Sequence, residues 1–200
     1  MFWDKVACVY DVFANVINAK THKELCRNIE ALIKPNDIIL ECACGTGMLS
    51  VHIAPRCKQL IATDYSKNML KRAEKKCKSF SNAVFQKCDI CRLDYPDQTF
   101  DKVVAANVIH LLDDPMIAMK ELDRVCKSGG LMIIPTYINR DSKGKNSSFS
   151  SAVGKAGADF KRQFTYTSYQ DFFVDAGYKR VEYKLIQGRV PCAVAVVHKE

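Results

Sequence analysis

The sequence predicts an α/β fold: a doubly wound sheet of seven strands, mostly parallel with an antiparallel terminal strand, and with N-terminal helices as a cover. From residue 38 onward, apolar runs of strand length alternate with segments of helical periodicity, a pattern typical of parallel sheets. The last two apolar runs are separated only by residues 188–191. Because parallel neighbours need a crossover of roughly a dozen residues, this short connection predicts an antiparallel pair.

Residues 1–34 are predicted to be a helical cover at the start of a single domain that spans residues 1–200. Within this cover, Thr21 and Glu24 have the spacing of a capping box, which predicts the start of a second helix. Pro35 then ends that helix and leads into the first strand. The first helix is inferred from apolar residues at helical spacing, namely Val6, Val9, Tyr10, Phe13 and Ile17.

Residues 35–200 are predicted to form the core of the domain, in which strands alternate with helices. The strands are expected at 38–43, 59–64, 83–88, 101–107, 131–137, 179–187 and 191–198. Helices are expected near 47–54, after a cap at Ser66, from Pro115 to a stop at 128–130, and from a cap at Thr167 or Ser168 to Gly177. The polar stretch 139–151 is expected to be irregular.

The composition is that of an ordinary globular chain, with 48% hydrophobic and 26% charged residues among 200. No apolar run approaches the roughly 18 residues that span a bilayer, and the N-terminus lacks the basic and apolar regions of a secretion signal. Several of the ten cysteines fall at apolar positions of expected strands and helices, which favours buried thiols in a reducing compartment. The protein is therefore expected to be cytoplasmic.

Much of the formal net charge of +8 comes from the helical segment 67–78. There Met69, Leu70 and Ala73 form an apolar stripe, and lysine and arginine side chains occupy the opposite face. A charge run of this kind is usually a solvated helix face. Weak association with an anionic membrane surface, or with RNA, is the alternative.

Two cysteine pairs raise the question of a metal site. Cys88 and Cys91 have C-x-x-C spacing, and one residue separates Cys42 from Cys44. A structural zinc site needs a matching second pair at such a spacing, and none is evident. The sequence is therefore interpreted as having no metal site.

The segment that bears most directly on function joins the first strand to its helix. Glu41 lies at the end of the strand, and a tight Gly-x-Gly turn at Gly45 and Gly47 follows. In a strand–turn–helix unit, glycines allow the backbone to approach a nucleotide-like ligand closely. Asp64 and Asp89 stand at the ends of the next two strands. Three acids at successive strand ends suit a ligand that carries an amino group and a ribose diol.

Residues 100–115 and 122–130, taken with the order of these motifs, resemble the class I S-adenosylmethionine-dependent methyltransferases. More narrowly, the chain looks like their small-molecule branch, the methyltransferase type 11 or menaquinone-biosynthesis-like enzymes. The resemblance covers nearly the whole chain and implies a Rossmann-like fold. It also implies that the cofactor is S-adenosylmethionine and that the product is S-adenosylhomocysteine.

The resemblance further implies that Glu41, Gly45 and Gly47 form the loop under the methionine and ribose portions of the cofactor. The family's first motif usually has a glycine at the position of Ala43. Because alanine is small, we expect a shifted loop at this point rather than a loss of binding.

The remaining cofactor-binding residues are implied by the same resemblance. Asp64 is expected to accept hydrogen bonds from the ribose hydroxyls, and Tyr65 to pack on the adenine. Asp89 is expected to accept from the adenine amino group, with the backbone N–H of Ile90 nearby. Asn107 is expected near the methionine amino group, with its carbonyl as the contact.

Two residues are candidates for the methyl-transfer step itself. Tyr10 lies in an N-terminal Tyr-Asp pair with Asp11, and the resemblance implies that it closes over the methyl group. His110 lies three residues beyond Asn107 and is the histidine nearest the expected methyl position, so it is the candidate general base. The alternative for His110 is a hydrogen-bonded structural residue under the loop.

These features predict methyl transfer to a small-molecule or lipid-like acceptor by in-line displacement. The alternatives are a nucleotide-cofactor binding module and an RNA-directed methyltransferase. A nucleic acid acceptor is disfavoured because Asn107 is followed by Val108 and Ile109 rather than by a Pro-Pro-aromatic segment. No feature of the sequence indicates an oligomeric state. An apolar acceptor pocket is expected to be walled by aromatic residues, namely Phe2, Trp3, Tyr10, Phe13, Tyr137, Phe149, Phe160, Phe164 and Tyr166.

Overall fold

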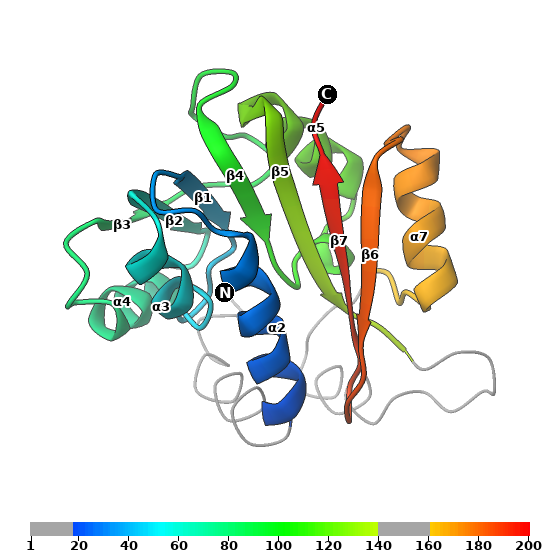
Figure 1. The fold of residues 1–200 in the computed structure, drawn as a ribbon, viewed down its shortest axis with the longest axis horizontal. Helices are drawn as coiled ribbons and strands as arrows, with labels where there is room; N and C mark the ends of the chain where they lie inside the picture. Colours follow the sequence, from blue (N-terminus) through cyan, green and yellow to red (C-terminus); the bar gives the residue numbers. More distant parts are fainter. Residues whose placement is uncertain (1–17, 140–160) are drawn as a thin grey trace.

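A computed structural model describes residues 18–139 and 161–200 of the chain (Figure 1). Strands and helices alternate along most of the described residues, as the sequence predicts. The strands are β1 (Ile38–Cys42), β2 (Gln59–Asp64), β3 (Ala83–Lys87), β4 (Phe100–Ala105), β5 (Cys126–Tyr137), β6 (Val181–Ile186) and β7 (Cys192–His198). The helices are α2 (Ala19–Leu32), α3 (Ser50–Ile53), α4 (Lys67–Lys76), α5 (Pro115–Val125) and α7 (Tyr166–Asp175), with short 3₁₀ turns η2 (Ala54–Arg56) and η3 (Ile109–Leu111).

Within the described residues, the seven strands form one sheet in the order β3-β2-β1-β4-β5-β7-β6. The pairs from β3 to β5 are parallel, whereas β7 pairs antiparallel with both β5 and β6. The predicted doubly wound sheet with an antiparallel terminal strand is therefore confirmed. The chain leaves β1 toward β2 on one side and returns to β4 on the other, so the strand order reverses next to β1.

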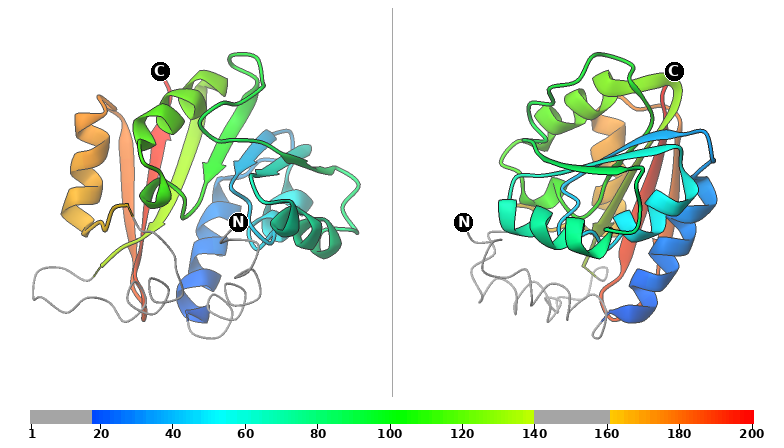
Figure 2. Two further views of the ribbon diagram at one scale, coloured as in Figure 1. Left: turned by 180° about the vertical axis from the view of Figure 1, so that it is seen from behind. Right: turned by 90° about the vertical axis from the view of Figure 1, so that its left-hand side faces the viewer.

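Helices cover both faces of the sheet (Figure 2). One core contains Ile39 of β1 together with apolar residues of α2, α3 and α4. The other contains Leu40 of the same strand together with residues of α5 and α7. Successive side chains of a strand point to opposite faces, so Glu41 faces the same side as Ile39. The acid therefore points toward the layer of α2 and α3.

Two of the predicted helix starts are confirmed. The Ser66 hydroxyl accepts the N–H of Met69 at 3.2 Å and caps α4. Pro115 occupies the first turn of α5, where its missing N–H costs no helical hydrogen bond. The Asp114 carboxylate caps the same helix by accepting the N–H of Met116 at 2.9 Å.

Two other predicted caps are wrong. The helix α2 begins at Ala19, so Thr21 lies inside it; the Thr21 hydroxyl is buried and donates to Asn18 at 2.9 Å. The helix α7 has its N-cap at Thr165, and the predicted cap Ser168 is the N3 partner in a capping box. At α7 a capping box is present but begins two or three positions earlier than predicted, whereas the N-cap residue of α2, Asn18, makes no side-chain capping hydrogen bond.

Tertiary context also changes several element lengths. The expected helix near 47–54 is only Ser50–Ile53, because residues 45–49 stay in turn conformation. The helix α5 ends at Val125 without the expected glycine stop, because β5 starts at the next residue and contains Gly129 and Gly130. None of the described helices is long and apolar enough to cross a membrane. The nine described cysteines are free thiols, and most are buried.

Candidate active site

The loop after β1 is built on left-handed backbone conformations. Ala43 has φ 52°, and Gly45 and Gly47 have φ 57° and 78°. The Cys44 N–H donates to Thr63 of β2 at 2.9 Å, so the loop remains attached to the sheet. A Cβ added at Gly45 would meet no atom within 4 Å, so this part of the backbone faces open space. The loop therefore presents bare main chain to a ligand.

Gly47 is required for packing. A Cβ at this position would lie 2.9 Å from the Cα of Ala73 in α4, closer than side chains tolerate. The missing side chain lets α4 pack directly on the loop. Lys76, one turn further along α4, donates to the Thr46 hydroxyl at 3.3 Å. The loop is thus held by the sheet on one side and by α4 on the other.

Glu41 is buried below this loop and accepts a hydrogen bond from the Ser50 hydroxyl at 2.6 Å. Burial, with a smaller contribution from the charge of Asp64, raises the pKa of Glu41 to about 8. Glu41 lines a small cavity together with residues of α2, the loop and the end of β4. A buried carboxylate in such a cavity is suited to a cationic ligand group, because a positive charge would compensate its desolvation.

Asp64 ends β2 and binds the loop through its carboxylate. One oxygen accepts the N–H of Gly45 and the other accepts the N–H of Ser66, both at 2.8 Å. Tyr65 beside it is 51% exposed, and the Lys87 ammonium lies 4.7 Å from the centre of its ring. The acid therefore shapes the glycine loop in addition to any contact with a ligand.

Asp89 and Ile90 follow β3, the neighbour of β2 in the sheet. Asp89 is exposed and accepts the N–H of Cys91 at 2.9 Å, whereas Ile90 is buried. In the parallel register, Asp64 lies opposite Lys87, two residues before Asp89. The two acids therefore lie at the same edge of the sheet, as the sequence predicts.

Asn107 follows β4 and is hydrogen-bonded to β5. Its backbone is left-handed, with φ 54°; its N–H donates to Pro135 at 2.8 Å, and its side-chain oxygen accepts the N–H of Tyr137 at 2.9 Å. Asn107, Tyr137 and Glu41 line the same small cavity. The side chain of Asn107 is thus engaged with β5, and the contact of its backbone carbonyl with a ligand stays a prediction.

His110 lies on η3 and is buried. Burial lowers its pKa to about 4, so the imidazole is neutral at neutral pH. Its backbone carbonyl accepts the N–H of Arg162 at 3.2 Å, and its side chain is not among the described residues that line the cavity with Glu41. Tyr10 lies outside the described residues.

The aromatic residues that were predicted to wall the acceptor pocket lie in different parts of the structure. Tyr137 lines the cavity with Glu41. Phe164 instead packs edge-on against Tyr169 and Phe172 in the core, so its assignment to a pocket wall is wrong. Tyr166 packs against the same core. The remaining predicted wall residues, Phe2, Trp3, Phe13, Phe149 and Phe160, lie outside the described residues.

Sequence reasoning missed the contribution of α2 to the site. His22 and Leu25 line the cavity with Glu41, and His22 also lines a second cavity, about 530 Å³ in volume, between α2 and α3. The only sequence signal for these residues was the apolar face of α2, because their placement depends on how the helix packs on the sheet.

Comparison with known proteins agrees with this geometry. A family model described as "Methyltransferase domain" matches residues 40–134. The demethylmenaquinone methyltransferase of Staphylococcus carnosus is 28% identical over 226 residues, covering 99% of this chain and 91% of the relative. The phosphatidylethanolamine N-methyltransferase of Cereibacter sphaeroides is 33% identical over 140 residues, covering 68% of this chain and 65% of the relative. A solved S-adenosylmethionine-dependent methyltransferase from Thermotoga maritima has a TM-score of 0.74 at 18% identity, covering 99% of each chain, which supports the fold.

The seven-stranded sheet, the glycine loop and these relatives define the chain as a class I S-adenosylmethionine-dependent methyltransferase. Within that class the chain is similar to small-molecule methyltransferases, among them the quinone-biosynthesis enzyme of Staphylococcus carnosus. The chain is therefore an enzyme.

Proposed function

We propose that the enzyme transfers a methyl group from S-adenosylmethionine to a compact apolar acceptor, such as a quinol-like ring or a lipid headgroup. The observation that carries this proposal is the buried carboxylate of Glu41 in a cavity beneath a glycine loop, with Asp64 and Asp89 at the next two strand ends. The quinone and phospholipid activities of the two relatives support this class of acceptor.

The side chains present fit this cofactor. Glu41 can pair with the ammonium of its methionine portion, because a cation would lower the raised pKa and keep the carboxylate charged. Each carboxylate oxygen of Asp64 accepts one backbone N–H and has capacity for a second hydrogen bond, such as that of a ribose hydroxyl. We assign Tyr65, Asp89 and Ile90 to the binding of the adenine portion of the cofactor.

When bound, the cofactor supplies a methyl group that its sulfonium charge has already activated. The residues of the chain then have to exclude water and hold an acceptor in line with that group. We assign His110 and Tyr10 to the acceptor side. At neutral pH the neutral imidazole of His110 can accept a hydrogen bond from an acceptor hydroxyl.

The exposed basic face of α4 extends the proposal to the membrane surface. Lys67, Lys71, Arg72 and Lys75 are exposed on this helix. A cluster of lysines and arginines attracts anionic lipid, and an apolar acceptor is itself dissolved in the membrane. We propose weak, salt-sensitive association, which sedimentation with anionic and neutral vesicles measures.

The experiment that tests methyl transfer combines labelled S-adenosylmethionine with a panel of quinols, phenols, thiols, phospholipids and transfer RNA. We expect label in the quinol or phospholipid samples. Transfer to RNA alone, or to no acceptor while the cofactor binds, would contradict the proposed acceptor class. Calorimetry with S-adenosylhomocysteine and NAD tests the cofactor separately, because binding of NAD alone would contradict the whole assignment.

Asp64→Ala and Asp89→Ala test the cofactor site itself. Loss of a hydrogen bond to the ligand costs about 1–3 kcal/mol, so each variant should weaken binding of S-adenosylhomocysteine by roughly tenfold to a hundredfold. Asp175→Ala is the matched control, because Asp175 is exposed at the end of α7. Unchanged affinity in both site variants, with a folded protein, would overturn the assignment.

His110→Gln tests the acceptor side. If His110 acts on the acceptor, the variant should lower kcat while its affinity for S-adenosylhomocysteine is unchanged. At saturating cofactor, where the ammonium keeps Glu41 charged, His110 should cause no change in kcat from pH 6 to pH 8, because a pKa of about 4 leaves its imidazole neutral over this range. A variant with full turnover would identify His110 as a structural residue.

A further inference from the structure

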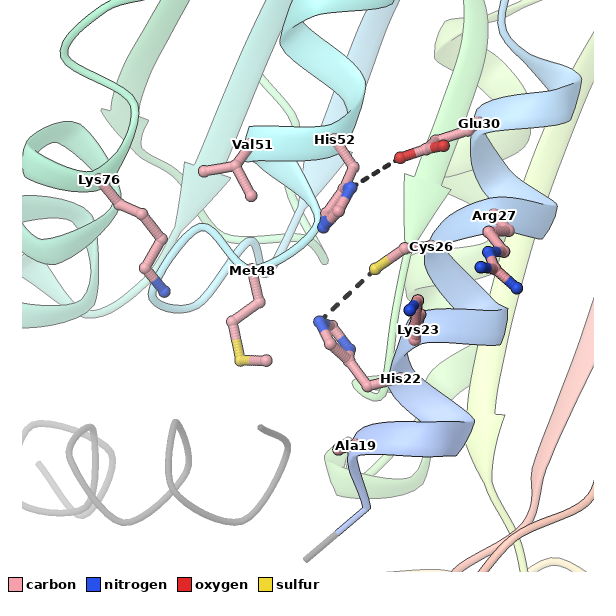
Figure 3. Close-up of a pocket in the computed structure, with 10 residues that line it drawn as sticks. All are labelled: Ala19, His22, Lys23, Cys26, Arg27, Glu30, Met48, Val51, His52 and Lys76. Carbon is pink, nitrogen blue, oxygen red and sulfur yellow. Dashed lines mark hydrogen bonds and ion pairs between the residues drawn. The ribbon is translucent and has the colours of Figure 1, made fainter. Parts of the chain in front are cut away.

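Three side chains with metal-binding atoms meet between α2 and α3, outside the residues assigned to the cofactor (Figure 3). His22 and Cys26 lie one turn apart on the same face of α2, and His52 faces them from α3. Their ligand atoms all lie within 4.8 Å of one another. The cluster unites residues about 26 positions apart in the chain, so the C-x-x-C spacing rules gave no sign of it.

The distances match the requirements of a tetrahedral ion. The Nε2 atom of His22 lies 3.5 Å from the Sγ atom of Cys26. With Zn–N near 2.0 Å and Zn–S near 2.3 Å, two ligands at the tetrahedral angle are separated by about 3.5 Å. The two α2 ligands are therefore already spaced as they would be around zinc.

The third ligand is oriented by a carboxylate. The Nδ1 atom of His52 is hydrogen-bonded to Glu30 at 2.6 Å, and Arg56 binds the other oxygen of that carboxylate at 2.9 Å. A histidine that binds a metal through one ring nitrogen commonly bonds a carboxylate through the other. Figure 3 shows the Nε2 side of the His52 ring facing the cluster. The hydrogen bond to Glu30 thus holds His52 in the tautomer and orientation of a ligand.

We propose that His22, Cys26 and His52 form a binding site for a divalent transition metal, with Zn²⁺ as the preferred ion. Two imidazoles and one thiolate are typical of zinc and unsuited to Mg²⁺ or Ca²⁺, which prefer oxygen ligands. Coordination replaces the thiol proton of Cys26, which is released to solvent. Three protein ligands leave a fourth position for water or another small ligand, and the site lines the cavity of about 530 Å³ between the helices.

The site would link α2 to the cofactor loop. The helix α3 starts at Ser50, directly after the loop, and Ser50 donates to Glu41. His22 and Met48 line both the cavity of the metal cluster and the cavity of Glu41. A bound ion would therefore cross-link α2 to the loop, and the protein would gain stability because only the folded state contains the site.

The test uses the full chain after treatment with a chelator. Zn²⁺ titrated against a chromophoric chelator should bind in one equivalent, and Co²⁺ should give a thiolate charge-transfer band with the intense visible bands of tetrahedral coordination. His52→Gln is the primary variant, because the ring is 40% exposed and its loss should not unfold the domain. It and Cys26→Ser should each weaken Zn²⁺ binding about a hundredfold or more, and Glu30→Gln about tenfold to a hundredfold.

Matched controls separate this site from other thiols and imidazoles. Cys77→Ser removes another buried cysteine, and His198→Gln removes a histidine that is paired with Glu182; both should bind Zn²⁺ as the wild type does. Unchanged binding in folded His52→Gln, a Co²⁺ spectrum without the thiolate band, or loss of binding in a Cys88→Ser and Cys91→Ser double variant would overturn the proposal. Thermal melts followed by circular dichroism establish that each variant is folded.

Discussion

Ala43 adopts a backbone conformation that favours glycine. Its φ of 52° is left-handed, which costs an L-residue about 1–2 kcal/mol. We predict that Ala43→Gly stabilises the protein by about 0.5–1 kcal/mol, because relief of this strain exceeds the entropy that glycine adds to the unfolded chain. Urea unfolding measures the change. Gly45→Ala is the control: with φ 57° and no atom near its Cβ, it should lose about 1 kcal/mol from strain alone. A destabilised Ala43→Gly would show that the alanine methyl makes a stabilising contact.

Glu41 should make the stability of the protein depend on pH. Its pKa rises from 4.5 to about 8 on folding, so between these values the folded state binds a proton that the unfolded state lacks. The free energy of unfolding should therefore fall as the pH rises from about 4.5 to about 8. Glu41→Gln should flatten this dependence and be more stable than the wild type at pH 8. Glu74→Gln, at an exposed position, should keep the wild-type slope. An equal slope in Glu41→Gln would indicate that Glu41 stays ionised.

At the residue scale, the sequence predicted which residues lie at the site better than it predicted which residues contact one another. Glu41, Gly45 and Asp64 were identifiable because a strand end and a tight turn are local patterns. The hydrogen bond from the Gly45 N–H to Asp64 joins residues on two strands, and only the sheet brings them together. The cluster of His22 and His52 depends on how α2 packs beside α3, which no local pattern encodes.

At the element scale, α2 is fixed by its contact with the hairpin between β6 and β7. Its N-cap Asn18 donates to Val190 at 3.0 Å and accepts from the same residue at 3.2 Å. The predicted capping box at Thr21 failed because this tertiary contact determines where the helix begins. Similarly, the start of β5 directly after α5 removed the expected glycine stop. Element types followed from periodicity, whereas element ends followed from neighbours that the local sequence does not name.

The same contact yields a prediction about Gly188. A Cβ at this position would overlap the hydroxyl of the fully buried Thr21. Gly188→Ala should therefore destabilise the protein by roughly 1–3 kcal/mol through overpacking. Thr21→Ala should recover part of that loss in the double variant, giving a favourable coupling energy in a double-mutant cycle. Ala31→Gly in α2 is the control for a change in helix stability alone. Gly177→Ala would be unsuitable as a control, because the φ of 84° at Gly177 would itself add backbone strain. Additive effects of the two substitutions would show that overlap with Thr21 is not the cause of the destabilisation.

At the scale of the whole molecule, the order of strands explains why the acids gather. Parallel strands present their carboxyl ends at one edge, and the order reverses next to β1, where open α/β sheets bind ligands. The sequence predicted this arrangement because alternation of strands and helices restricts the topology to few solutions. It did not predict that α2 closes one side of the cavity, since that depends on apolar packing across long sequence separations.

This arrangement predicts selective stabilisation by the product of methyl transfer. A ligand that binds only the folded state at a hundred times its Kd adds about 2.7 kcal/mol to the free energy of unfolding. For a domain of this size, that corresponds to a rise in Tm of roughly 5–10 °C. S-adenosylhomocysteine should produce such a rise, which should increase with the logarithm of its concentration, whereas NAD should produce none. Asp175→Ala should retain the shift and Asp89→Ala should reduce it, because only the second acid lies at the ligand-binding edge of the sheet. An equal shift with NAD would mean that the edge recognises a nucleotide in general and that the acids do not select the methionine portion.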